Sequence, residues 1–332
     1  MDKINAVGKK VLLFCPSFFG YDLRIADALR ECGCEVDLHN EKPGNRFIDK
    51  ASVRLNIGLY RPVIKKYIQS VIDSHRDKQY DYVLVVKGEA ITREAVSLMR
   101  KAYPNAKFVL YLWDSVENIP ECDSRMRKYD RILTFDPQDA KDYNLLLRPL
   151  FFGKEYGQAA GQQSYEYDFA FVGTAHSIRP RVVGQLARER AEKGRKSFSY
   201  LFLPHPLVYL NNKLRNPCFR SVRMSDIHFK PMSAEEIRDV YGRSKCILDV
   251  EHDAQRGLTM RTIELVGMQK KMITTNVQVR DYDFYNPRNI YVIDRDHPAV
   301  DEDFWDTPYE PIPEHILSRY SITSFVQEIL DM

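Results

Sequence analysis

Short runs of almost continuous apolar residues recur along this chain, and each is followed by turn residues and a segment with helical periodicity. The first run is KKVLLFC, which leads through a glycine-containing loop into LRIADALREC. Such runs are typical of parallel strands that helices cover on both faces. The pattern predicts an α/β fold built from doubly wound, Rossmann-like sheets.

The alternation of strand and helix forms two series. The strands expected after the first are CEVDL, DYVLVVK, KFVLYLW and DRILTF, then YDFAFVG, SFSYLFL, DIHFKPM, KCILDVE, KKMITTN and NIYVID. Between the two series, GKEYGQAAGQQSYEY loses its apolar periodicity and gains Gly and Gln, as a surface connection does. A chain of 332 residues is long enough for two cores. We predict a first domain over 1–152, a linker over 153–167 and a second domain over 168–332, with both sheets facing a cleft.

Composition and charge exclude several classes of protein. Lys and Arg exceed Asp and Glu by only three, too few for a dedicated nucleic-acid binder. No apolar run is long enough to span a bilayer, and the first residues lack the pattern of a cleaved leader, so we expect a cytoplasmic protein. The six cysteines have neither CxxC spacing nor a nearby histidine cluster, which predicts reduced thiols and no metal site.

Four features of the second half occur in a family-specific order. They are a strand with a glycine turn, YDFAFVGT; a strand and helix start within HFKPMSAEEIRDVYGRSKCILDV; the segment GLTMRTIELVGMQKKMITTN; and a closing helix, SITSFVQEIL. In this order they resemble the donor-binding domain of GT-B glycosyltransferases of the group-1 type, which includes spore-maturation and surface-polysaccharide enzymes. The resemblance covers the second half well, and the first half only as a fold.

The resemblance implies a set of residues that bind a nucleotide sugar. Backbone N–H groups at a helix start suit a diphosphate, and a carboxylate further along the helix suits ribose hydroxyls. Transfer without a metal also needs cations that compensate the charge on the departing phosphate. The implied binding residues are Gly173, Thr174, Lys230, Pro231, Gly257, Leu258, Thr259 and Glu264. Many relatives place an Arg and a Lys after the first glycine turn, but the basic residues of this chain are placed differently, and the candidates for these cations are Arg179, Arg261 and Lys230.

One position departs from the family pattern. Relatives often carry two glutamates eight positions apart, whereas Arg256 stands eight positions before Glu264. Glu251 or Asp253 could replace the missing acid, or either could be a solvated loop residue. The donor sugar therefore stays open; the resemblance implies a UDP- or GDP-linked donor substrate and no separate cofactor.

The first half offers candidates for acceptor binding. Phe19, Gly20 and Tyr21 follow the first strand and suit stacking on a sugar, although they could equally pack their own loop. Asp114 follows another strand, where it could act as the general base of an inverting transfer or simply cap a helix. A retaining enzyme would need no such base.

Two segments have an apolar stripe that must be covered. The segment 51–76 has Leu55, Leu59, Val63, Tyr67 and Val71 beside Arg61, Lys65 and Lys66, so it could lie on anionic lipid or cover the sheet as an ordinary helix. The last helix has Ile322, Phe325, Val326 and Ile329, and the resemblance implies that it crosses back to the first domain.

These observations predict a metal-independent hexosyltransferase that moves sugar from a nucleotide-diphosphate sugar to a saccharide or lipid-linked acceptor. The resemblance implies surface polysaccharide or lipopolysaccharide biosynthesis, with a peripheral contact at the inner face of the membrane. A nucleotide-sugar epimerase and a non-catalytic binding scaffold are the alternatives. The Asp-x-Asp pairs at Asp281 and Asp283 and at Asp294 and Asp296 would instead fit a metal-dependent GT-A transferase, but they occur after a complete two-domain pattern.

Overall fold

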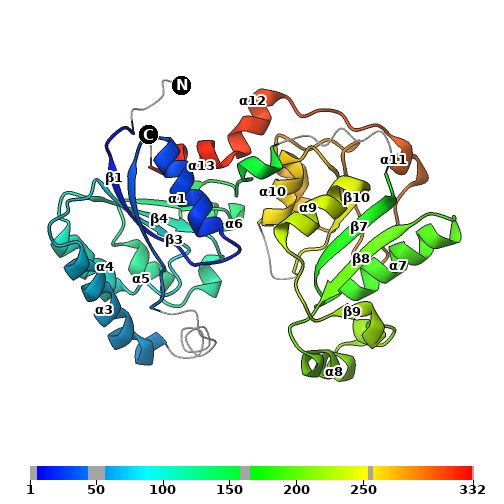
Figure 1. The fold of residues 1–332 in the computed structure, drawn as a ribbon, viewed down its shortest axis with the longest axis horizontal. Helices are drawn as coiled ribbons and strands as arrows, with labels where there is room; N and C mark the ends of the chain where they lie inside the picture. The colour runs from blue at the N-terminus through cyan, green and yellow to red at the C-terminus, as the bar shows by residue number, and fades with distance from the viewer. Residues whose placement is uncertain (1–5, 44–56, 158–164, 253–256, 331–332) are drawn as a thin grey trace. The chain divides into compact units, whose positions relative to one another are not determined.

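The chain divides into two compact α/β units (Figure 1). The computed structural model describes residues 6–43, 57–157, 165–252 and 257–330. Unit 1 comprises Met1–Phe151 and Arg319–Met332, and unit 2 comprises Phe152–Ser318. Each unit contains a six-stranded parallel sheet with helices packed against it, which confirms the predicted fold class.

The sheet of unit 1 has the strand order β2-β1-β3-β4-β5-β6. Its strands are β1 (Lys10–Phe14), β2 (Glu35–His39), β3 (Tyr82–Val86), β4 (Lys107–Leu112), β5 (Arg131–Thr134) and β6 (Leu146–Leu147). The first five are the strands that the apolar runs predict. The sequence did not indicate β6, because two residues are too few to show a period.

Helices cover both faces of this sheet (Figure 1). The helices of unit 1 are α1 (Tyr21–Glu31), α3 (Ile57–Ser74), α4 (Arg93–Ala102), α5 (Cys122–Met126), α6 (Pro137–Asp142) and α13 (Ile322–Leu330). Helices α1 and α13 pack together, and the ring of Phe325 on α13 lies 4.8 Å from Tyr111 of β4 and 4.3 Å from Phe151, between centroids. The last helix thus contributes to the core of unit 1.

Helix α3 covers the opposite face together with α4 and α5. Its buried side chains Tyr60, Ile64, Ile68 and Val71 belong to the core of unit 1. Leu55 and the side chain of Leu59 lie outside the described part of the chain. In its described part, α3 therefore covers the sheet through these four side chains, whereas Val63 of the predicted stripe is 45% exposed.

The sheet of unit 2 has the order β12-β11-β10-β7-β8-β9, and the sequence predicted all six strands. They are β7 (Tyr167–Thr174), β8 (Ser197–Phe202), β9 (Ile227–His228), β10 (Ser244–Asp249), β11 (Lys271–Thr274) and β12 (Ile290–Val292). The helices are α7 (Arg179–Glu192), α8 (Pro206–Arg215), α9 (Ala234–Arg243), α10 (Met260–Gly267), α11 (Glu302–Asp306) and α12 (Glu314–Leu317).

Several helices start where side chains can bond to free backbone N–H groups. Asp136 caps α6 with Pro137 at the first helical position, and Ser233 and Glu236 form a capping box on α9, as their spacing predicts.

Helix α10 contacts β10 and β11 and also the short turn that follows Phe152. Gly267 makes that approach possible, because a Cβ there would collide with the Phe152 ring.

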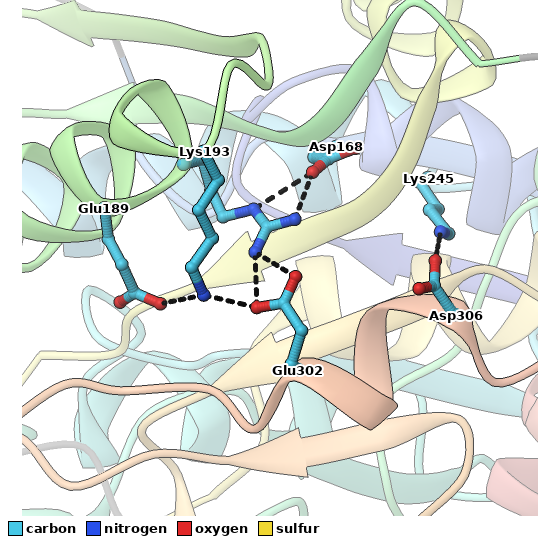
Figure 2. Close-up of polar contacts among 7 residues, drawn as sticks. Asp168, Glu189, Lys193, Lys245, Glu302 and Asp306 are labelled. Carbon is cyan, nitrogen blue, oxygen red and sulfur yellow. Dashed lines mark hydrogen bonds and ion pairs between the residues drawn. The ribbon is translucent and has the colours of Figure 1, made fainter.

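A network of charged residues joins α7, β7 and α11 in unit 2 (Figure 2). Arg190 is almost fully buried; its Nη2 lies 2.6 Å from Asp168 and its Nη1 lies 3.1 Å from Glu302. The guanidinium also stacks over the Trp305 ring at 4.3 Å. Each charge has a partner, so the network holds α11 against the sheet without leaving a buried charge unpaired.

Candidate functional site in unit 2

The candidate site lies where β7 and β10 end and where α7 and α10 begin. Parallel strands place all their carboxyl ends at one edge of the sheet, and ligands of open α/β sheets bind there. Strand β7 ends at Gly173 and Thr174, and β10 ends at Asp249. The structure thus brings both predicted glycine turns to one edge of unit 2.

Asp249 organises the start of α10. Its carboxylate is 1% exposed and accepts hydrogen bonds from the hydroxyls of Thr259 at 3.1 Å and Thr262 at 2.6 Å. Thr259 is the N-cap of the helix and accepts from the Thr262 backbone N–H. The predicted turn residues Leu258 and Gly257 precede it; Leu258 is buried, and the Gly257 carbonyl accepts from Asn276. The turn is thereby fixed in place before any ligand binds.

Arg261 reaches from the first turn of α10 to the end of β7. Its Nη2 donates to the Val172 carbonyl at 2.5 Å, and its Nη1 lies 3.4 Å from Asp249 Oδ1. A Cβ on Gly173 would lie 3.0 Å from Arg261 Nη2, so a larger residue there would crowd the guanidinium. This close approach is a structural reason for glycine at position 173, and it does not depend on any ligand.

Arg179, at the start of α7, lies beside Arg261. Its Nε donates to the Val250 carbonyl at 2.7 Å, and its Nη1 donates to the Thr174 carbonyl at 3.2 Å. Both guanidinium groups lie over the ring of Phe171, at 5.9 Å for Arg179 and 5.4 Å for Arg261. Two predicted cations therefore occur together, next to Gly173 and Thr174.

The two arginines have opposite electrostatic environments. Burial lowers the pKa of Arg179 to about 10, and the neighbouring charge of Arg261 acts in the same direction. Burial also opposes the charge of Arg261, but Tyr241, Asp249 and Glu264 outweigh it and raise its pKa. The protein itself therefore stabilises the charged form of Arg261, whereas an anionic ligand would relieve the unfavourable environment of Arg179.

Glu264 lies one helical turn after Arg261 and is half-buried. Its carboxylate is one of the charges that raise the Arg261 pKa. The sequence predicted a carboxylate further along the helix than the diphosphate turn, and in the structure Glu264 is the fifth of the eight residues of α10.

Glu251 has its own partners in the loop after β10. The carboxylate hydrogen-bonds to the Thr275 hydroxyl and forms an ion pair with Arg295, while burial raises its pKa. Asp253 and Arg256, the other positions in the question of the missing acid, lie outside the described residues.

Asp249, Thr262 and Arg295 were not singled out from the sequence. The position of Asp249 at the end of a buried strand was the signal that could have identified it.

Lys230 and Pro231 lie at a different part of the same edge. They follow β9 and are exposed, and β8 separates β9 from β7. The Lys230 carbonyl accepts from the Tyr200 hydroxyl at 2.8 Å, and the Tyr200 ring stacks on His228 at 3.8 Å between centroids. The structure therefore separates these two residues from the arginine pair by one strand.

The candidates in unit 1 differ in how open they are. Phe19 is 76% exposed, whereas Tyr21 is 6% exposed and packs on Trp113 and Phe151. Gly20 connects them with a φ of 75°, a conformation that favours glycine. Of the two aromatic rings, Phe19 is the one left open to a ligand.

Asp114 follows β4 and accepts hydrogen bonds from the Ser115 N–H at 3.1 Å and the Asn118 amide at 3.0 Å. Lys87 Nζ lies 3.8 Å from its second carboxylate oxygen and 3.2 Å from Glu89. Burial would raise the pKa of Glu89, but Lys87 and Lys42 hold it at about 2.

Within the described ranges, no group of three or more His, Cys, Asp or Glu side chains has the arrangement of a metal site.

Comparison with known proteins gives matches among solved structures. No protein-family model matches the sequence, and no curated protein matches it significantly. An alpha-glucosyltransferase in complex with UDP and a 13-mer DNA aligns with a TM-score of 0.61 and 12% identity, over 97% of this chain and 98% of that one.

Two further structures align over similar lengths. The Anabaena protein HepE in complex with UDP and glucose gives a TM-score of 0.61 at 11% identity, over 97% of this chain and 98% of that one. The lipopolysaccharide outer core galactosyltransferase WaaB in its apo form gives 0.52 at 12% identity, over 97% and 99%. The identities are low, so these alignments are evidence about the fold. The chain has the GT-B fold.

Proposed function

We propose that the protein is a glycosyltransferase that moves a hexose from a UDP- or GDP-linked donor to a saccharide or lipid-linked acceptor. The observation that carries this proposal is the pair formed by Arg179 and Arg261 beside the start of α10. Binding of UDP by two of the structural neighbours supports a nucleotide sugar as the ligand. The function of WaaB supports, at 12% identity, a role in surface polysaccharide or lipopolysaccharide synthesis.

The reaction places specific demands on these residues. The acceptor oxygen attacks the anomeric carbon, the bond from that carbon to the terminal phosphate oxygen breaks, and the diphosphate leaves with the bonding electrons. We assign stabilisation of that charge to Arg179, Arg261 and the N–H groups at the start of α10, without a metal ion. Gly173, Thr174, Gly257, Leu258 and Thr259 would shape the diphosphate turn.

The remaining roles follow from the positions of the other side chains. Glu264 would accept hydrogen bonds from ribose hydroxyls, and Lys230 and Pro231 would contact the base. In unit 1, Phe19 would stack on the acceptor beside Gly20 and Tyr21, and Asp114 would take the acceptor proton if the transfer inverts configuration. We place this activity in the cytoplasm, where nucleotide sugars would be available to the enzyme.

A panel of nucleotide sugars tests the proposal. Full-length protein should bind UDP or GDP in calorimetry and should transfer sugar from the matching donor when an acceptor mixture is present. Arg179→Gln should weaken diphosphate binding by about tenfold or more, as loss of a charge-assisted hydrogen bond does. Arg188→Gln, an exposed position on the same helix, is the matched control and should bind like the wild type.

The same assay separates the alternatives. Conversion of the donor to an epimer without an acceptor would identify an epimerase. No nucleotide binding at millimolar concentration would instead favour a non-catalytic scaffold.

A further inference from the structure

Helix α8 exposes a row of leucines to solvent. Leu207, Leu210 and Leu214 are 66%, 48% and 88% exposed, and their spacing of three and four residues places them on one side of the helix. The buried Tyr209 lies on another side and packs into the core of unit 2. Helix α8 thus has apolar residues on its solvent-exposed side as well as on the side that packs against unit 2.

The same region is strongly basic. Residues 204–232 contain five basic residues and one acidic residue, a formal net charge of +4, whereas the whole chain has +3. Arg215 and Arg220 are exposed. Met224, 44% exposed, adds a further apolar side chain near the end of this region. We call Leu207, Leu210, Leu214, Arg215, Arg220 and Met224 the α8 surface.

The α8 surface lies at the periphery of unit 2, near β9 (Figure 1). Its link to the candidate site is Asn216, the C-cap residue of α8, whose side-chain amide donates to the Ser177 carbonyl at 2.9 Å. Ser177 lies in the short loop between Thr174 and Arg179 and has a φ of 47°. The helix that carries the exposed leucines is therefore hydrogen-bonded to the loop that leads to Arg179, which we propose binds the diphosphate.

We propose that the α8 surface docks on an anionic lipid membrane. Exposed leucines beside arginines fit the two layers of such a membrane, because the acyl region accepts the apolar side chains and the headgroups attract the cations. A stable protein interface usually buries about 800 Å² on each partner and is enriched in aromatic residues. The exposed apolar side chains here are three leucines on one short helix and Met224 after it, with no aromatic ring among them. They lie in a basic region, so an anionic lipid surface is the occupant that fits.

This assignment goes beyond the proposed function, because lipid docking does not depend on transfer activity. It also differs from the hypothesis that the 51–76 segment meets lipid, because it concerns another helix, in unit 2. Docking through α8 would hold the Thr174–Arg179 loop near the lipid surface. A lipid-linked acceptor would reach the site there by diffusion in two dimensions.

Vesicle sedimentation with the full-length protein tests the proposal. The probes are vesicles of phosphatidylcholine alone and of phosphatidylcholine with 30% phosphatidylglycerol, a working composition at which the surface is clearly anionic. The wild type should sediment with the anionic vesicles and remain in the supernatant with the neutral ones. Leu207→Ser/Leu214→Ser and Arg215→Gln/Arg220→Gln should each reduce the bound fraction by about tenfold, since both contributions are needed for stable attachment.

Matched variants separate this effect from general changes at the surface. Leu146→Ser/Leu147→Ser replaces two exposed leucines of β6 in unit 1 and should leave vesicle binding unchanged. All variants should bind UDP or GDP as the wild type does, so a failure of lipid docking is distinguishable from a failure of the proposed function. Equal vesicle binding by the wild type and Leu207→Ser/Leu214→Ser would overturn the proposal. A concentration-dependent dimer that this double variant abolishes would also overturn it, because the occupant would then be a second copy of the chain.

Discussion

At the scale of single residues, the candidate site is a set of charges that fix one another. Asp249 accepts from two threonine hydroxyls and pairs with Arg261, which in turn bonds to the end of β7. Arg179 has carbonyl partners but lies beside another cation. For the diphosphate that we propose as the ligand, Arg261 is the cation already paired within the protein, and Arg179 is the one whose charge is less compensated.

Glu264 provides the first test at this scale. Glu264→Ala should weaken nucleotide-sugar binding by roughly tenfold to a hundredfold, the cost of losing a charge-assisted hydrogen bond of about 1.5–3 kcal/mol. The protein should remain folded, because the side chain is only half-buried. Calorimetry with the donor measures the effect, and Glu192→Ala, at an exposed position on α7, is the control. Unchanged donor affinity would contradict the assignment of Glu264.

Glu41, in unit 1, predicts a pH dependence of stability. Its side chain is fully buried, and burial raises its pKa from 4.5 to about 7. Between these two values the folded protein keeps the proton and the unfolded chain releases it, so the free energy of unfolding falls as the pH rises. Glu41→Gln cannot ionise and should lose less stability between pH 5 and pH 8, by about 1–3 kcal/mol.

Urea denaturation at the two pH values measures this difference. Glu31→Gln, at an exposed position on α1, is the control and should follow the wild type. Identical pH profiles for the wild type and Glu41→Gln would show that Glu41 does not titrate in this range.

At the scale of elements, α13 joins the last residues of the chain to the core of unit 1. Phe325 is fully buried between Tyr111 and Phe151, and Arg148 lies over its ring at 5.6 Å. Phe325→Ala should lower the free energy of unfolding by about 3–5 kcal/mol, the cost of a large cavity in a core. The urea midpoint monitors it, and Thr323→Ala on the same helix should have a much smaller effect. Equal small effects would mean that α13 is loosely attached.

The elements also show which features can be predicted from sequence. Strands such as β1 and β4 were predicted because buried parallel strands have nearly continuous apolar runs. The capping of α9 is a similarly local feature, because it needs only a Ser and a Glu three residues apart, Ser233 and Glu236. Helix α8 was not predicted, because its exposed leucines blur the helical period and Pro206 precedes them.

Residues that act through long-range contacts were harder to recognise. Asp249 gains its role from Thr259, Arg261 and Thr262 across a loop, and no local pattern records such contacts. Conversely, Tyr21 looked like a ligand-facing aromatic residue, but Trp113 and Phe151 cover it.

At the scale of the whole molecule, the proposed reaction uses arginines and helix N–H groups for charge compensation. We therefore predict that transfer activity survives EDTA, because the cations that stabilise the leaving diphosphate belong to the chain itself. The measurement is product formation before and after chelation, followed by addition of manganese. Loss of activity with EDTA and recovery with manganese would require a metal-dependent mechanism instead.

The contribution of α13 to unit 1 also has a consequence for biosynthesis. Unit 2 is one continuous stretch, Phe152–Ser318, whereas unit 1 needs Arg319–Met332 in addition to the first part of the chain. Domains fold as units while the ribosome is still adding residues, usually in the order in which they emerge. Unit 1 does not follow that order, because it cannot be completed before α13 has been synthesised. Until then, the surface that receives Phe325 stays uncovered.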